Sequence, residues 1–167
     1  MRTAAAVFAA LACTVYGAYL RTGLMKRVRV LRELYTFLRE AHTRILCLRE
    51  PFPQMLASCA ESFPALPFLR DCTAACAAGA ALPEAWCAAV RRFLRTCPLT
   101  KEEAKLLSAC VPALAAADAQ RIAETLALYT ENVQMCVRRA EAQQEAWGKL
   151  CIRVCGAVGV LLGILIL

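Results

Sequence analysis

The sequence predicts an all-α protein, a helical bundle held between an N-terminal and a C-terminal membrane helix. Three observations lead to this fold class. Residues 3–20 and 154–167 carry no charged side chain. The more polar middle repeats its apolar residues at steps of three and four, which is typical of amphipathic helices. No segment has the alternating pattern of a strand. The expected domains are a transmembrane helix at 1–21, a cytoplasmic bundle at 22–149 and a transmembrane helix at 150–167.

The first apolar run has two interpretations. It contains "AALAC", which loosely resembles a lipobox ending at Cys13, so an exported lipoprotein-like binding domain is one alternative. The run continues to Leu20, however, and a basic block follows it, formed by Arg21, Lys26, Arg27, Arg29 and Arg32. Such a block resists translocation, so a retained membrane helix is favoured. A second basic group, Arg138, Arg139, Lys149 and Arg153, precedes the last run. The positive-inside rule then predicts a cytoplasmic middle segment with both termini outside.

Residues 24–48 form the first predicted helix of the bundle. Its apolar face consists of Leu24, Val28, Leu31, Tyr35, Leu38, Ala41 and Ile45. Charged residues, among them Arg29, Glu33 and Glu40, occupy the opposite face and are candidates for a partner contact. Pro51 and Pro53 end the helix, because the residue before a proline is biased away from helical geometry.

Prolines divide residues 51–98 into short helices. Pro53 and Pro83 suit the first turn of a helix, and Gly79 suits the end of one. The segment after Pro83 has an apolar face formed by Trp86, Val90, Phe93 and Leu94. Arg91, Arg92 and Arg95 form its basic face. This face is either a contact surface for a partner or a solvated surface near a helix C-terminus.

The last third of the chain predicts two helices. Thr100 and Glu103 form a capping box that opens a helix interrupted at Pro112. Asp118 suits the N-cap of the next helix. A seam with alternating steps of four and three follows, formed by Ile122, Leu126, Tyr129, Val133, Cys136, Ala140, Gln143, Trp147, Leu150 and Val154. A continuous helix over 119–167 is about 70 Å long, which exceeds a domain of this size, so its end is expected in the membrane. Gly159 and Gly163 form a GxxxG motif that favours close packing against residues 3–20 or another protomer.

Motifs for chemistry are missing from the sequence. It has no phosphate-binding loop, nucleophile elbow or zinc-protease motif, and His42 is its one histidine. The eleven cysteines are scattered without a CxxC, and in a reducing cytoplasm they act as small apolar residues. The basic residues follow the predicted membrane topology, and no basic face is interleaved with aromatics, so nucleic acid is not an expected partner. We therefore expect no enzyme activity, cofactor or metal.

Several segments together carry a resemblance to a known family. They are the basic "LRELYTFLRE" helix, "P-x-P-Q", "G-x-x-L-P-E-A-W", the "L-T-K-E-E-A-K-L-L" helix start, an Asp-led long helix and a Gly-punctuated terminal span. Their order and spacing resemble the stage III sporulation protein AB family of endospore-forming bacteria. The family is also similar to the cytoplasmic domain of the platform protein in type II secretion and type IV pilus machines.

The resemblance implies a subunit of the membrane channel complex between mother cell and forespore. It implies an outer forespore membrane location, with the helical domain in the mother-cell cytoplasm. The implied partners are the secretion-type ATPase of the complex, stage III sporulation protein AA, and other channel subunits. Other copies of the chain are a further partner to test, since the sequence leaves an oligomer open. The expected function is to transmit movement of the ATPase to the membrane. The alternative is a passive scaffold or clamp without a motor link.

Overall fold

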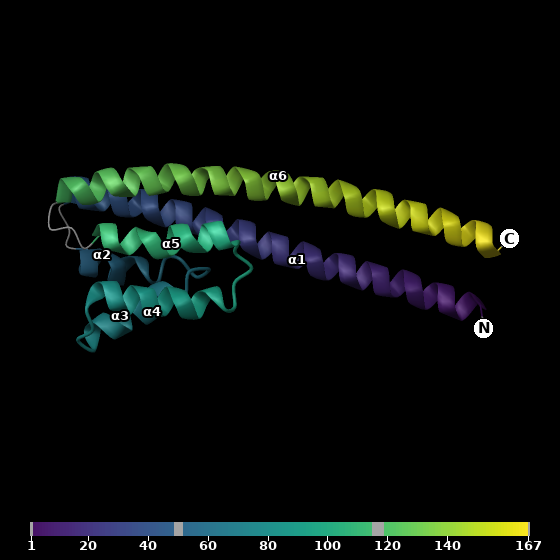
Figure 1. The fold of residues 1–167 in the computed structure, drawn as a ribbon, viewed down its shortest axis with the longest axis horizontal. Helices are drawn as coiled ribbons and strands as arrows, with labels where there is room; N and C mark the ends of the chain where they lie inside the picture. The colour runs from purple at the N-terminus through teal and green to yellow at the C-terminus, as the bar shows by residue number, and fades with distance from the viewer. Residues whose placement is uncertain (1, 49–51, 115–118, 167) are drawn as a thin grey trace.

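The computed structural model describes residues 2–48, 52–114 and 119–166, and every regular element in these ranges is a helix. This confirms the all-α prediction. Two long helices, α1 (Arg2–Thr43) and α6 (Ala119–Ile166), lie antiparallel and extend together beyond the shorter helices (Figure 1). The two ends of the chain therefore lie at the same end of the molecule. We call the extending parts, residues 2–23 and 147–166, the stalk, and the remainder the bundle.

Four shorter helices complete the bundle. They are α2 (Phe52–Cys59), α3 (Phe68–Ala77), α4 (Leu82–Leu94) and α5 (Lys101–Leu114). In Figure 1, α5 lies next to the long pair, and α3 and α4 form the side of the bundle opposite α6. The predicted helix at 24–48 begins much earlier, since α1 is continuous from the stalk, and its end is a π-helical turn at Arg44–Leu48.

Helix α1 is buried on more than the predicted face. That face is confirmed by the burial of Val28, Leu31, Leu38, Ala41 and Ile45. Val30, Leu34 and Phe37 are buried as well. The additional burial has a tertiary cause, because α1 contacts α6 on one side and the layer of shorter helices on the other. An apolar repeat predicts burial on one face of a helix, and it cannot predict that a helix at the centre of a bundle is buried on several faces.

Helix α6 confirms the predicted continuous helix. It has 48 residues, about 72 Å at the helical rise. Its seam is buried at Leu126, Val133 and Ala140, and then its residues become exposed as the helix enters the stalk. The predicted N-cap, Asp118, lies outside the described residues.

Local signals in the sequence explain the ends of the short helices. Gly79 has φ +92° after α3, and the amides of Gly79 and Ala80 donate to the carbonyls of Cys76 and Ala75. This is a Schellman end, which requires a left-handed residue and so favours glycine. Pro83 lies in the first turn of α4 as predicted. Helix α5 continues past Pro112 to Leu114, contrary to the predicted interruption, because the proline lies in the last turn and few helical bonds follow it.

Trp86 is the centre of the core. Its side chain is 1% exposed, and its ring lies 5.2 Å from Phe68 of α3 and 6.5 Å from Phe37 of α1, measured between centroids. Its indole N–H donates to the carbonyl of Leu107 in α5 at 3.2 Å. One side chain of α4 thus contacts three other helices, and the buried N–H is satisfied.

The membrane predictions concern the stalk. Within the ranges whose side chains are described, no helix is both long enough and apolar enough to cross a bilayer. Most side chains of residues 1–21 and 150–167 lie outside those ranges, including the surroundings of Gly159 and Gly163. The two transmembrane helices and the GxxxG contact therefore stay predictions.

Candidate partner-binding surface

A buried ion pair joins three helices where the bundle meets the stalk. Arg27 of α1 binds Glu103 of α5 with its Nε at 3.1 and 3.2 Å and its Nη2 at 2.7 Å. The two side chains are 13% and 4% exposed. Arg27 Nη1 also donates to Oε1 of Gln143 on α6 at 2.9 Å. We call these three residues the neck.

Glu103 also caps α5. Its carboxylate accepts from the amide of Thr100 at 2.8 Å, and the Thr100 hydroxyl accepts from the amide of Glu103 at 3.4 Å. This confirms the predicted capping box. A carboxylate that receives a guanidinium and a backbone amide has its lone pairs satisfied, which is what makes a buried charge tolerable. The neck therefore combines a helix cap with a contact between three helices.

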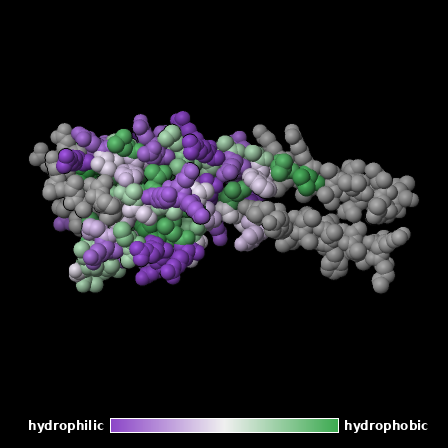
Figure 2. Space-filling view, in the orientation of Figure 1, coloured by the Kyte–Doolittle hydropathy of each residue, from purple (hydrophilic) through white to green (hydrophobic). Residues whose placement is uncertain are grey.

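The arginine face on α4 is the most exposed candidate surface that the sequence predicted. Arg91, Arg92 and Arg95 are all exposed, and Figure 2 shows a strongly hydrophilic area over this side of the bundle. Arg92 lies 3.1 Å from Asp71 of α3, an exposed pair that contributes little stability. Arg91 and Arg95 have no carboxylate partner among the described residues. This face is thus a group of solvent-accessible cations on a firmly packed helix.

The candidate residues on α1 are engaged in the bundle's own contacts. Glu33 pairs with Arg29 at 3.2 Å, and its other oxygen accepts from the amide of Ala65 at 2.7 Å. Glu40 pairs with Arg44 at 2.6 Å, and Arg44 also donates to Ser58. These contacts hold the segment between α2 and α3 and the end of α1. No hydrogen bond or ion pair of the described residues joins them to the arginine face, and the partner interface predicted from both groups stays a prediction.

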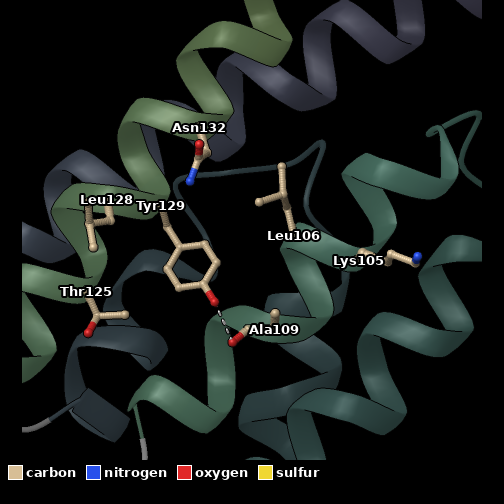
Figure 3. Close-up of a pocket in the computed structure, with 7 residues that line it drawn as sticks. All are labelled: Lys105, Leu106, Ala109, Thr125, Leu128, Tyr129 and Asn132. Atoms are coloured by element: carbon tan, nitrogen blue, oxygen red, sulfur yellow. Dashed lines mark hydrogen bonds between the residues drawn. The ribbon is translucent and has the colours of Figure 1, made fainter.

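A groove between α5 and α6 is a feature that the sequence analysis missed. It has a volume of about 430 Å³ and is lined by Lys105, Leu106, Ala109, Thr125, Leu128, Tyr129 and Asn132. Figure 3 shows Tyr129 pointing across it, where its hydroxyl donates to the Ala109 carbonyl at 2.9 Å, while Lys105 points away. Burial raises the pKa of the Tyr129 hydroxyl, so it stays a neutral donor. Leu128, 64% exposed, lies at the rim and adds apolar surface, but its position outside the seam gave no sequence signal.

The cysteines of the bundle core are poorly suited to chemistry. Burial raises the pKa of Cys110 and of Cys72 to about 12, and that of Cys97 to about 11. A thiol with such a pKa is almost entirely protonated at neutral pH and is a weak nucleophile. Within the described part of the chain, no three His, Cys, Asp or Glu side chains gather into a possible metal site. The expectations of no catalysis, no cofactor and no metal remain predictions.

The fold and these surfaces define a class of protein, an elongated helical bundle on a two-helix stalk that offers exposed faces for contact. The particular family follows from comparison with known proteins. The chain belongs to the stage III sporulation protein AB family, whose model matches residues 2–167. No curated protein and no solved structure matches the chain significantly. Membership of this family supports a role in sporulation and confirms the family resemblance.

The buried pair at the neck can be tested by a double-mutant cycle. Glu103→Gln keeps the capping box, because glutamine serves at this position, but leaves Arg27 buried without a countercharge. We expect this variant to lose about 3 kcal/mol of unfolding free energy, measured by urea titration of the purified chain. Arg27→Met added to it should recover part of the loss, with a coupling energy above about 1.5 kcal/mol.

The exposed pair Asp71–Arg92 is the matched control for this cycle. Asp71→Asn with Arg92→Met should give a coupling energy below about 1 kcal/mol. Equal coupling energies for the two pairs would show that the neck is no stronger than a surface contact.

Proposed function

We propose that this chain is a membrane-anchored coupling subunit of the sporulation channel complex between mother cell and forespore. In this proposal both stalk helices are anchored in the outer forespore membrane, and the bundle lies in the mother-cell cytoplasm. The bundle engages the secretion-type ATPase of the complex, stage III sporulation protein AA, and passes its movement to the membrane. The observation that carries the proposal is the continuity of α6, which packs in the bundle and extends without a break through the stalk.

The ATPase contact is proposed for Arg91 and Arg95. These cations are exposed at the C-terminal end of α4, and α4 lies on the side of the bundle opposite α6 (Figure 1). Trp86 joins α4 to α1, α3 and α5. A force applied to α4 therefore acts on a closely packed core. At the neck, Glu103 of α5 binds Arg27 of α1, and Arg27 in turn binds Gln143 of α6. Helix α5 is also joined to α6 by the Tyr129 hydroxyl, which donates to the Ala109 carbonyl. This chain of contacts supports the transfer of movement from the arginine face to the stalk, and coupling measurements must establish it.

Charge reversal on the arginine face tests the ATPase contact. We expect Arg91→Glu with Arg95→Glu to weaken binding of the purified full chain to the ATPase by about tenfold or more, because several exposed charges change sign at the contact. The measurement is the Kd from interferometry in detergent.

The matched control for this experiment reverses two exposed arginines at the far end of the long helices. Arg39→Glu with Arg121→Glu makes the same change in net charge and should leave the Kd within about twofold. Equal weakening by both double variants would mean that only net charge matters, and no weakening by the first would remove the arginine face from the contact.

The main rival is a passive scaffold or clamp that holds channel subunits and transmits nothing. Residues 144–146 of α6 distinguish the two, because they lie next to the neck and outside the seam. Changing all three to glycine weakens the helix by about 3 kcal/mol relative to alanine. We expect this variant to assemble with the other subunits and yet to form at least about tenfold fewer heat-resistant spores.

The control is the same segment with three alanines, which keeps the length, the phase and the stiffness of α6. It should sporulate at the level of the unmodified chain. If the glycine and alanine variants assemble and sporulate equally well, a stiff α6 is not needed and the passive clamp is the better description.

The second rival is an exported, lipoprotein-like binding domain. Cys47 is an exposed cysteine of the described bundle and a better reporter than Cys59, which is buried, or Cys97, which is half-buried with a pKa of about 11. With the bundle in the cytoplasm, a membrane-impermeant thiol reagent should label Cys47 only after the cells are permeabilised. The Cys47→Ala variant identifies the signal that belongs to this residue, and labelling of Cys47 in intact cells would favour the exported domain.

A further inference from the structure

Large apolar and aromatic side chains are exposed at the junction between the bundle and the stalk. Tyr19 is 73% exposed on α1, and Trp147, Leu150 and Val154 are 41%, 51% and 51% exposed on α6. The three residues on α6 continue the same seam that is buried at Ala140. Figure 2 shows hydrophobic surface on this part of α6, next to the end of the described side chains. Something other than the bundle must cover this surface if it is not left in water.

The neck contacts place these side chains at known levels. Arg27 of α1 contacts Gln143 of α6, so these two residues lie at the same height along the stalk axis. The height of any other residue on either helix can be counted from them. Trp147 lies one helical turn beyond this height, about 6 Å, and Tyr19 lies two turns beyond it, about 12 Å. Both aromatic residues thus fall in one short layer just outside the bundle.

Cations occupy the same layer. Arg21 and Lys26 are both exposed on α1. Arg21 lies about 9 Å beyond the level of Arg27, between Trp147 and Tyr19, and Lys26 lies about 2 Å beyond it, next to the neck. The sequence has no acidic residue before Glu33, and none after Glu145. Glu145 is exposed on α6, and Glu102 is exposed next to the neck beside the oppositely charged Lys101. The sequence adds Lys149 and Arg153 beyond Glu145. The layer is therefore positively charged overall.

We propose that Tyr19, Arg21, Lys26 and Trp147 form a collar that lies among anionic phospholipid headgroups and fixes how deeply the stalk is inserted. Tyrosine and tryptophan are the aromatic residues that favour the boundary between headgroups and acyl chains, and lysine and arginine next to them attract anionic lipid. Leu150 and Val154, farther from the bundle, then face the acyl chains. The inference rests on the proposed membrane anchoring and adds a lipid class and a boundary to it.

Fluorescence of Trp147 tests the collar directly. The sequence has two tryptophans, so Trp86→Phe leaves Trp147 as the single tryptophan in the full chain. The chain is reconstituted into phosphatidylcholine vesicles that carry bromine at either shallow or deep acyl positions. We expect the shallow bromines to quench Trp147 more than the deep ones. If the Trp86 variant does not fold, the difference in emission between the unmodified chain and Trp147→Phe gives the same quantity.

The lipid preference is measured by replacing brominated phosphatidylcholine with brominated phosphatidylglycerol at the same mole fraction. The quantity obtained is the affinity of the Trp147 surroundings for phosphatidylglycerol relative to phosphatidylcholine. We expect this ratio to rise by about fivefold for each basic residue at the surface. Arg21→Gln with Lys26→Gln should bring the ratio close to one. The matched control, Arg39→Gln with Arg121→Gln, removes two exposed charges at the opposite end of the long helices and should keep the preference.

Each outcome is informative. Absence of quenching at both depths in a chain that floats with the vesicles would overturn the collar and show that protein covers Trp147. Stronger quenching by the deep bromines would place the boundary elsewhere, and a lipid preference that survives the Arg21 and Lys26 changes would overturn the role of these cations. A chain that does not float with vesicles at all would overturn the membrane anchoring itself, together with the collar.

Discussion

The contact of Arg27 with Glu103 and Gln143 determines how this molecule is built. One carboxylate closes the first turn of α5 and binds the guanidinium of α1, and the same guanidinium reaches α6. Three helices are therefore held at one level, with the packed bundle on one side and only the two long helices on the other. A buried charge has few acceptable partners, so this arrangement permits one geometry where apolar packing alone would permit several.

The core extends this constraint through the bundle. Trp86 connects α4 to three helices and belongs to the main cluster of buried residues, while Val28, Leu31 and Ala140 form a second, smaller cluster between α1 and α6. Close-packed interiors deform little, so the bundle resists deformation as a unit. The groove between α5 and α6 and the arginine face lie on the outside of this unit. In the function proposed above, a partner at either surface contacts this packed unit, and the neck is its polar connection to the two stalk helices.

Local patterns in the sequence predicted the elements well, and contacts between distant residues could not be predicted from them. The seam of α6, the apolar face of α1, Gly79, Pro83 and the Thr100–Glu103 box all depend on residues within a few positions of one another. The pairing of Arg27 with Glu103 spans 76 positions, and that of Glu33 with the Ala65 amide spans 32. Glu33 looked like a surface residue because nothing nearby reveals its partner. The wider burial of α1 and the groove beside Tyr129 have the same tertiary origin.

The polar residue in the α6 seam explains why the long pair has one register. An apolar seam repeats every seven residues, so two helices joined by it alone can slide by one repeat at modest cost. Gln143 interrupts that equivalence, because a slide would separate it from Arg27 and leave the guanidinium facing an apolar side chain. Arg32 also pairs with Glu141 across the two helices at 2.6 Å, an exposed contact that adds little to this. Sliding of α1 against α6 is thus opposed at the level where the stalk begins, which is what the proposed coupling role requires of these two helices.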